Sequence, residues 1–461
     1  MHVRPDLRSS CFQLSGVDAA RLEAKTSAKT SAYLYMLRSY VKFLPSDPHA
    51  RFPLGICSAV VASAELACHL GGRTAFCASS TEGIAMGFVN RVILVLASTA
   101  TAVAAPAAPP GTLSHSDPVV ETPVGAQAWR IRYWTTSDQG QPIEVTGMVV
   151  APREAIPAKS RAVLAWTHGT WGVAEQCAPS RSANFFAATP GLSDAMRRGF
   201  VIVAPDYPGL GNPTSHAYLG GIEAANSTLD AVRAARQIAG AASGSRFVVW
   251  GESQGGHAAL WTAQRARTYA PDLQLLGVVA AAPPTDLAAN LRAGSDPSVR
   301  AFLTAFTAYS WSRHYGAPLA NLGNRSTQGI ITRLAQNNCV ELGKKPRLGT
   351  MLGVLALRKS LQNVDLGTIA PWSDFARRNS VSASLTGVPL LIAQNPNDKI
   401  VDPKVTRAFA SRVCRNGGRL QYLPISGQGH ETSAKDTAAA TLTWAAARFS
   451  GTPAPSNCGH F

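Results

Sequence analysis

A series of short, continuously apolar runs limits most strongly what this 461-residue chain can fold into. The runs are rich in Val, Ile, Leu and aromatic residues, and turns or segments of helical spacing separate them. A strand that is apolar at every position has both faces buried, which is typical of a parallel sheet covered by helices on both sides. We therefore predict an α/β fold with a mostly parallel sheet, with strands at 127–136, 143–151, 161–166, 200–204, 246–250, 275–280, 388–393 and 419–424.

The first two runs are expected to differ from the rest. The turn Asp138-Gln-Gly140 lies between them, and this spacing predicts an antiparallel hairpin that opens the sheet. Helical spacing of the apolar residues predicts helices over 183–198, 229–238 and 433–449.

One interval interrupts the alternation of strands and helices. Residues 283–385 separate two core strands by about a hundred residues, whereas a crossover between parallel strands needs only about a dozen. Helical stretches at 299–311, 327–341 and 348–361 occupy this interval, with almost no strand signal. We therefore predict a core at 115–285 and 386–461, with a helical cap, or lid, inserted at 286–385.

A G-x-S-x-G motif at Gly251-Glu-Ser253-Gln-Gly255 follows one predicted strand and precedes a helix. A nucleophile on such a sharp strand-to-helix turn needs very small neighbours, because the two backbones approach closely there. The turn aims the hydroxyl away from the sheet and places a helix N-terminus beneath a developing oxyanion. The context predicts Ser253 as a nucleophile, whereas the bare pattern also occurs by chance in loops.

A serine hydroxyl requires a base that is itself oriented by a carboxylate, and here the chain order should be Ser, acid, His. Asp398 directly follows a late apolar strand, and His430 directly follows the last strand. Asp402 competes with Asp398, but Pro403 follows it, which suits the N-cap of a helix. We predict Asp398 as the acid and His430 as the base.

The segment after the 161–166 strand is the expected source of an oxyanion hole. We predict that the backbone N–H groups of Thr170 (or of Trp171 beside it) and of Gln254 form the hole. The alternative is that His168-Gly169 only forms a tight turn. The other histidines, His216, His257 and His314, are better explained as core or surface residues.

The N-terminal part of the chain contains a secretory signal away from Met1. Starting at Met86, a short segment with one Arg precedes about a dozen apolar residues and then small residues, which is the layout of a signal peptide. We predict a signal peptide at 86–105, cleaved after Ala104 or Ala105, and a secreted protein. Residues 1–85 are then explained by a start codon assigned too far upstream. The alternatives are an N-terminal extension, or an apolar run that is a buried strand and no signal peptide.

The remaining cysteines suit an exported chain. Without the leader four remain, and this even number predicts two disulfides with three possible pairings. None has C-x-x-C spacing, so we expect no metal site. The formal charge of +16 comes from scattered Lys and Arg residues, so we expect no nucleic-acid partner, but transient contact with an anionic surface such as lipid headgroups fits. The four cysteines are Cys177, Cys339, Cys414 and Cys458.

Four segments together resemble one known family. WTHGTWG with CAPS (166–180), PDYPGLG (205–211), LDAVRAAR (229–236) and WGESQGGHAAL (250–260) resemble the secretory lipases, whose yeast members include the lipase A type. The resemblance extends from about residue 115 to the C-terminus.

The resemblance implies an α/β-hydrolase core with a helical cap, and the roles already given to Ser253, Asp398 and His430. It also implies two disulfides, Cys177 with Cys339 and Cys414 with Cys458. The HGT segment at 168–170 differs from the yeast members and is closer to bacterial esterases, so a preference for long-chain triglycerides does not follow.

The expected activity is hydrolysis of acyl esters, acylglycerols among them, by a serine esterase or lipase that needs no metal or organic cofactor. The same fold and residues also suit a feruloyl or acetyl esterase acting on acylated cell-wall polysaccharide, or a peptidase, because specificity lies in the cap and pocket walls. A non-catalytic binding protein on this fold is the remaining alternative.

Overall fold

The computed structural model describes residues 108–154, 160–341, 345–427 and 429–461. The predicted leader (1–85) and signal peptide (86–105) lie outside these ranges. Within them, no helix has both the length and the apolar character needed to cross a bilayer.

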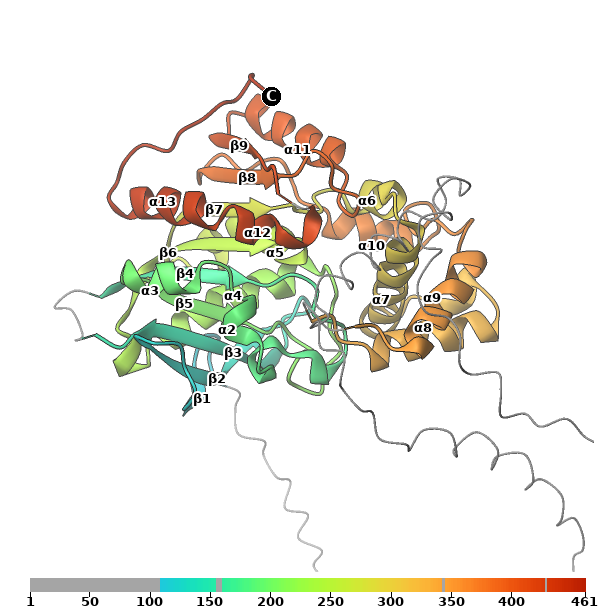
Figure 1. The fold of residues 1–461 in the computed structure, drawn as a ribbon, viewed down its shortest axis with the longest axis horizontal. Coiled ribbons are helices and arrows are strands. Elements are labelled where there is room, and N and C mark those ends of the chain that lie inside the picture. Colours follow the sequence, from blue (N-terminus) through green and yellow to red (C-terminus); the bar gives the residue numbers. More distant parts are fainter. Residues whose placement is uncertain (1–107, 155–159, 342–344, 428) are drawn as a thin grey trace, which may run out of the picture. The chain divides into compact units, whose positions relative to one another are not determined.

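The core is a nine-stranded sheet in the order β1-β2-β3-β5-β4-β6-β7-β8-β9 (Figure 1). The pairs β1–β2, β2–β3 and β3–β5 are antiparallel. From β5 onward along the sheet every pair of neighbouring strands is parallel. The predicted mostly parallel sheet is therefore confirmed. The strands are β1 (Leu113–Pro118), β2 (Ala126–Thr136), β3 (Pro142–Pro152), β4 (Arg161–Thr167), β5 (Val201–Pro205), β6 (Ser243–Glu252), β7 (Gln274–Ala281), β8 (Leu390–Gln394) and β9 (Leu420–Pro424).

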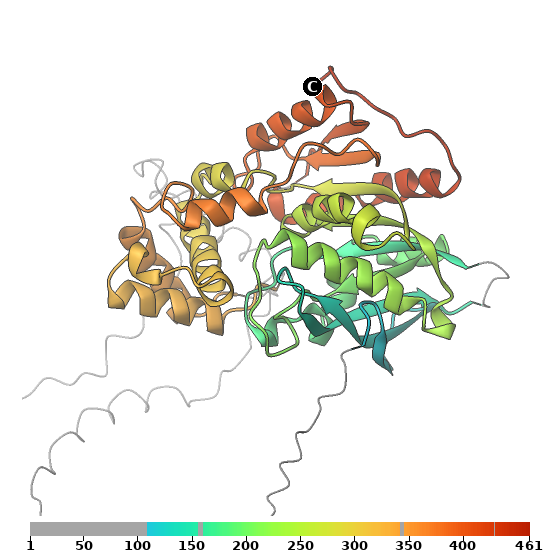
Figure 2. The same cartoon turned by 180° about the vertical axis from the view of Figure 1, so that it is seen from behind.

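Alternate residues of the central strands enter two separate cores, one on each face of the sheet. In β6, Phe247 and Val249 pack on one side and Val248 and Trp250 on the other, which explains why these strands are apolar at every position. Figure 1 shows one set of helices in front of the sheet, and Figure 2 brings the other set forward. The first set is α2 (Phe185–Ala188), α3 (Leu192–Arg197), α12 (Ser433–Asp436) and α13 (Ala438–Phe449), and the second is α4 (Gly221–Ala235), α5 (Gln254–Tyr269) and α11 (Pro403–Arg415).

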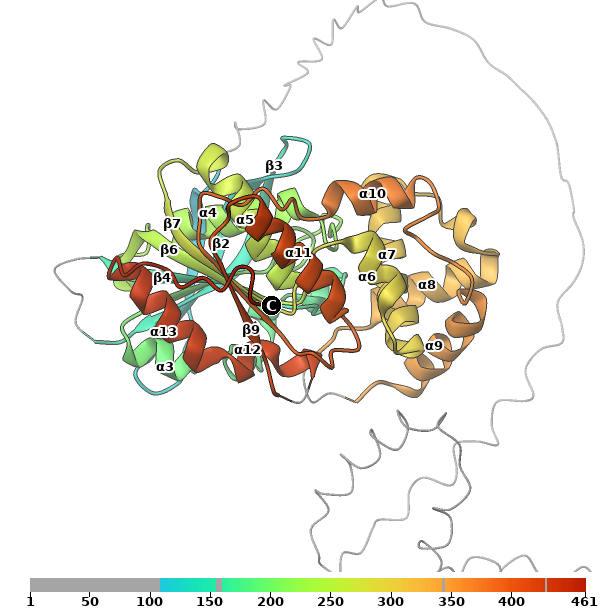
Figure 3. The ribbon, with the colours of Figure 1, turned by 90° about the horizontal axis from the view of Figure 1, so that it is seen from above.

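Between β7 and β8 the described residues form helices and no strand. These helices share a core of their own, in which Phe306, Trp311 and Trp372 are completely buried. Seen from above, they form a layer to one side of the sheet (Figure 3). They are α6 (Leu287–Ala293), α7 (Pro297–Tyr315), α8 (Arg325–Asn337), α9 (Leu348–Ser360) and α10 (Trp372–Asn379), and we call them the cap.

Several elements differ from their predicted bounds. The helix expected over 183–198 is two helices, because Pro190 and the left-handed Gly191 (φ 61°) interrupt it. The helix expected over 229–238 begins earlier, at Gly221, and the one expected over 433–449 is divided at Thr437. Strand β1 was not predicted because most of its residues are exposed, so its sequence carries no apolar run.

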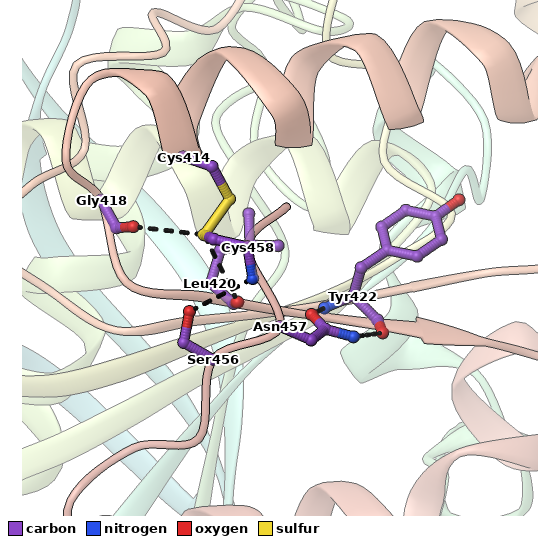
Figure 4. The surroundings of a disulfide bond; sticks show 7 residues. All are labelled: Cys414, Gly418, Leu420, Tyr422, Ser456, Asn457 and Cys458. Atoms are coloured by element: carbon purple, nitrogen blue, oxygen red, sulfur yellow. Dashed lines mark hydrogen bonds between the residues drawn. A yellow bond between two sulfur atoms is a disulfide. The ribbon is translucent and has the colours of Figure 1, made fainter. Parts of the chain in front are cut away.

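Two disulfides tie the outer segments to this frame. Cys177–Cys339 joins the chain after β4 to the cap, and Cys414–Cys458 joins the end of α11 to the C-terminal tail. Figure 4 shows how the tail is held against β9: the Asn457 side chain accepts from the Tyr422 N–H (2.7 Å) and donates to the Tyr422 carbonyl (2.9 Å). The pairing is the one that the family resemblance implies.

Candidate active site

Ser253 lies on the turn between β6 and α5, in a backbone conformation that a non-glycine residue rarely adopts (φ 54°, ψ −120°). Its glycine neighbours are a steric requirement. A Cβ on Gly251 would lie 2.1 Å from the Gly255 carbonyl oxygen, and one on Gly255 would lie 1.8 Å from the Thr167 carbonyl oxygen. The strained turn is anchored by a hydrogen bond from the Ser253 N–H to the Ala281 carbonyl (2.8 Å). This packing fixes the hydroxyl at the carboxyl edge of the parallel strands.

Three side chains far apart in the sequence meet at this edge. The His430 Nε2 atom lies 2.7 Å from Ser253 Oγ, and its Nδ1 atom lies 2.8 Å from Asp398 Oδ2. The Asp398 side chain is buried, and His430 is nearly so. With Nδ1 protonated toward the carboxylate, Nε2 is free to accept the serine proton.

The carboxylate of Asp398 is held in place by the backbone after β8. Its Oδ1 atom accepts from the N–H groups of Ile400 (2.8 Å) and Val401 (3.0 Å), and Oδ2 accepts from the Gln394 side chain (3.0 Å). Burial raises the pKa of Asp398, but the His430 contact and the two backbone N–H groups outweigh it and lower the pKa below its usual value. Asp398 is therefore ionised at neutral pH.

The electrostatics of His430 follow from the same contacts. Burial lowers its pKa, but the hydrogen bond and charge of Asp398, together with the charge of Glu252, outweigh burial and raise the pKa above the usual value for histidine. The imidazolium that forms when the base takes a proton is thus stabilised.

Glu252 is a site residue that sequence reasoning did not single out. Its Oε1 atom accepts from the Ala434 N–H (2.8 Å), which joins the end of β6 to α12, just beyond His430. Burial raises the pKa of Glu252 to about 7. Its position directly before Ser253 could have indicated a role in the site. Nothing in the sequence indicated that α12 would pack against Glu252. Gln394, the last residue of β8, was also missed, because nothing in the sequence indicated that its side chain would turn toward Asp398.

The segment after β4 passes close to the nucleophile. A Cβ built on Gly169 would lie 3.9 Å from the Ser253 Cβ. Next to it, the Thr170 hydroxyl contacts the Tyr218 hydroxyl (2.8 Å), and the Trp171 carbonyl accepts from the Val340 N–H (2.8 Å). Gln254 is the first residue of α5, where a backbone N–H has no partner within the helix. The structure thus brings the segment that contains Thr170 close to Ser253, and Gln254 directly follows Ser253 at the start of α5.

Comparison with known proteins identifies the family. The sequence pattern that defines the secretory lipases matches residues 187–457, more than half of the chain. The chain belongs to the secretory lipase family. Among its relatives, Lipase 4 of Candida albicans is 25% identical over 363 residues (74% of this chain, 77% of the relative). A probable inactive lipase from Mycobacterium tuberculosis is 24% identical over 379 residues (75% of this chain, 79% of the relative).

Two solved structures have the same fold as this secretory lipase. Candida antarctica lipase A in its closed state superposes with a TM-score of 0.62 at 20% identity, over 76% of this chain and 85% of that one. A rice cell wall degrading esterase from Xanthomonas oryzae superposes with a TM-score of 0.55 at 18% identity, over 74% of this chain and 97% of that one. The α/β-hydrolase fold expected from the family resemblance is confirmed.

A narrow cavity of about 60 Å³ extends from Ser253 between the core and the cap. Its walls come from α6, α7 and the loop after β8, and most of the lining side chains are apolar. It also reaches Tyr218 and Gln254 beside the nucleophile. The lining side chains from the cap and the β8 loop include Leu287, Leu291, Val299, Leu303, Ile400 and Val401.

The other histidines of the described residues lie elsewhere. His257 is buried in α5 and its Nε2 contacts the Asn379 carbonyl (2.7 Å). The His168 ring contacts the carbonyls of Gly169 and Asp206. Burial lowers the pKa of His216 to about 3, so this ring is neutral; its Nδ1 contacts the Pro208 carbonyl. His314, in the cap helix α7, contacts Asp138 and Glu223 of the core.

Proposed function

We propose that this protein is a secreted serine carboxylic-ester hydrolase that works through an acyl-enzyme on Ser253. One observation carries the proposal: Ser253, His430 and Asp398 form a continuous hydrogen-bonded chain at a strained strand-to-helix turn. Family membership alone would not suffice, because one relative is a probable inactive lipase. The two disulfides fit an exported protein.

The proposed reaction proceeds in two halves. Ser253 Oγ attacks the ester carbonyl while His430 Nε2 takes its proton, and Asp398 stabilises the imidazolium. The backbone N–H groups of Thr170 and Gln254 stabilise the tetrahedral oxyanion. His430 then protonates the leaving alcohol. Water attacks the acyl-enzyme by the same route, with His430 as base, and releases the acid and free Ser253.

The proposed substrates are acyl esters, acylglycerols among them. The apolar side chains that line the cavity beside Ser253 support an acyl group as the part of the substrate bound there. The cavity of about 60 Å³ has room for only a few water molecules, so a longer acyl chain requires side chains of α6 or α7 to move.

Contact with a lipid surface is also part of the proposal. Helix α9 carries four exposed apolar side chains at helical spacing, and no acidic residue. Exposed basic residues flank them, which suits binding to an anionic interface. The apolar side chains and their exposed fractions are Leu348 (68%), Met351 (39%), Leu352 (58%) and Leu355 (48%), and the basic residues are Arg347, Arg358 and Lys359.

A cell-wall polysaccharide esterase is the second candidate function. It is favoured by the fold shared with the rice cell wall degrading esterase and by the small size of the cavity, which suits an acetyl group better than a long acyl chain. The catalytic residues would be the same, and the alcohol part of the substrate would differ.

Labelling by a fluorophosphonate probe tests the nucleophile directly. The wild-type protein should be labelled, and Ser253→Ala, with unchanged circular dichroism, should not be. Labelling that persists in Ser253→Ala would refute the assignment, and a wild-type protein that resists the probe would indicate a non-catalytic binding protein.

A panel of substrates then separates the two esterase functions. The panel contains p-nitrophenyl esters of increasing chain length, a feruloyl ester, an acetylated xylan and a peptide. Highest kcat/KM on medium or long acyl chains supports the lipase-type function. Highest kcat/KM on the acetylated or feruloylated carbohydrate supports the second candidate, and cleavage of the peptide alone would contradict both.

A further inference from the structure

A second group of one histidine and two carboxylates lies where the cap meets the core. Asp138 belongs to the turn between β2 and β3, Glu223 to the first turn of α4, and His314 to the last turn of α7. One nitrogen or oxygen atom from each of the three lies within 4.8 Å of the other two. The side chains of Glu223 and His314 are 3% and 9% exposed, and that of Asp138 is 15% exposed.

The distances in this group suit ligands around one cation better than direct hydrogen bonds. The His314 Nε2 atom is 3.4 Å from Asp138 Oδ1 and 3.7 Å from Glu223 Oε1. The His430–Asp398 hydrogen bond of the same protein is 2.8 Å. Two ligands at about 2.0–2.1 Å from a tetrahedral Zn²⁺ ion lie about 3.4 Å apart. The distance from His314 to Asp138 therefore matches the edge of such a tetrahedron, and the distance from His314 to Glu223 is slightly longer.

A buried oxygen without a partner gives an independent indication. Glu223 is 2% exposed, and its Oε2 atom is buried without a hydrogen-bond partner. A buried carboxylate oxygen needs a donor or a cation, because its desolvation is otherwise uncompensated. Its sister atom Oε1 faces His314 and accepts only a long bond from the Asp138 N–H (3.4 Å).

The far side of the His314 ring is arranged as in many metal sites. Its Nδ1 atom lies 3.2 Å from the Ser215 hydroxyl, which orients the ring and leaves Nε2 facing the carboxylates. Arg378 also acts electrostatically on Asp138.

We propose that Asp138, Glu223 and His314 bind one divalent transition-metal ion of the zinc class, with water completing its coordination. One histidine and two carboxylates suit this class, whereas Ca²⁺ prefers six to eight oxygen ligands. The ion would join the β2–β3 turn and α4 to α7. Because α7 also lines the cavity beside Ser253, the ion would hold the cap against the core.

The test measures binding of Zn²⁺ to the full-length protein, purified without a polyhistidine tag and freed of metal by a chelator. Calorimetric titration with ZnCl₂ should give one site per chain, and saturating Zn²⁺ should raise the Tm by several degrees. Glu223→Gln keeps the size of the side chain and removes one ligand charge. It should weaken Zn²⁺ binding at least about tenfold and abolish the rise in Tm.

Glu121→Gln is the matched control, because it makes the same change at an exposed position outside the group. It should bind Zn²⁺ as the wild type does. If Glu223→Gln fails to fold, Asp138→Asn takes its place with the same expected loss. Absence of stoichiometric Zn²⁺ binding, or equal binding by wild type and Glu223→Gln, would overturn the proposal and leave a protonated His314 between two carboxylates. Neither readout depends on ester hydrolysis.

Discussion

His430 and His314 both lie beside carboxylates, but the two side chains differ in the length of their contacts and in the elements that they connect. His430 makes short contacts to one carboxylate and one hydroxyl, 2.8 Å and 2.7 Å. The His314 Nε2 atom faces two carboxylates at 3.4 Å and 3.7 Å, and its Nδ1 atom lies 3.2 Å from the Ser215 hydroxyl. Ser253 lies on a strained turn beside a cavity, so the short contacts of His430 can activate its hydroxyl for attack. The longer contacts of His314 join the cap to the core.

The two groups also differ in what they connect. Asp398 and His430 follow β8 and β9, so both are placed by the edge of one parallel sheet. Asp138, Glu223 and His314 come from a hairpin turn, a core helix and a cap helix. A sheet edge holds side chains at fixed spacing, whereas the junction between cap and core depends on how two separate cores pack.

The largest expected effect is the difference in kcat between the variants His430→Gln and His314→Gln. His430→Gln removes the proposed base and should lower kcat on a p-nitrophenyl ester by about 10⁶-fold, as removal of a triad histidine does. His314→Gln should keep kcat within about tenfold. The measurement is steady-state kinetics on both variants at matched circular dichroism. Comparable losses in the two variants would break the distinction.

The next largest effect concerns the partner of His430. Asp398→Asn should lower kcat by about 10⁴-fold, because the imidazole loses its orientation and the stabilisation of its charged form. The acid limb of the residual kcat/KM profile should also move to lower pH. The sign follows from the pKa of His430: Asp398 raises it, and only the neutral imidazole acts as base. A limb that stays in place would show that another group titrates.

For stability, the expected order of the two variants is reversed: His314→Gln should be the more damaging one. In chelator-treated protein, His314→Gln should lower the free energy of unfolding by about 3 kcal/mol, because the buried Glu223 and the half-buried Asp138 then lose their positive partner. His430→Gln should cost less, because Asp398 keeps its two backbone N–H donors and the Gln394 amide. Urea unfolding of both variants checks the order. A larger loss in His430→Gln would contradict the structural role given to His314.

The smallest effect is expected at Glu252. Glu252→Gln keeps an oxygen to accept the Ala434 N–H and removes the charge that raises the pKa of His430. Since burial raises the pKa of Glu252 itself to about 7, its charge is only fully present above that pH. The acid limb should therefore shift to lower pH by a fraction of a unit, with kcat at high pH changed by no more than about threefold. A shift to higher pH would contradict this account.

Much of the fold could be predicted from the sequence, because buried strands and helices have characteristic patterns of apolar residues. Strands buried on both faces carry continuous apolar runs, as the central residues of β6 do, so most of β4 to β9 were predicted within a few residues of their bounds. Strand β1, most of whose residues are exposed, has no such run. Helix α4 was predicted too short because its first turns bury polar residues such as Glu223 and Asn226 among other elements.

The sequence by itself determined the turn that carries Ser253, since only glycine fits beside it, and the order of the residues that could partner the serine. Those signals are local, because they depend on neighbours along the chain. Only tertiary packing brings Glu252 to α12 and brings Asp138, Glu223 and His314 together. Contacts between residues tens to hundreds of positions apart depend on how the sheet, helices and cap pack, which no local pattern encodes.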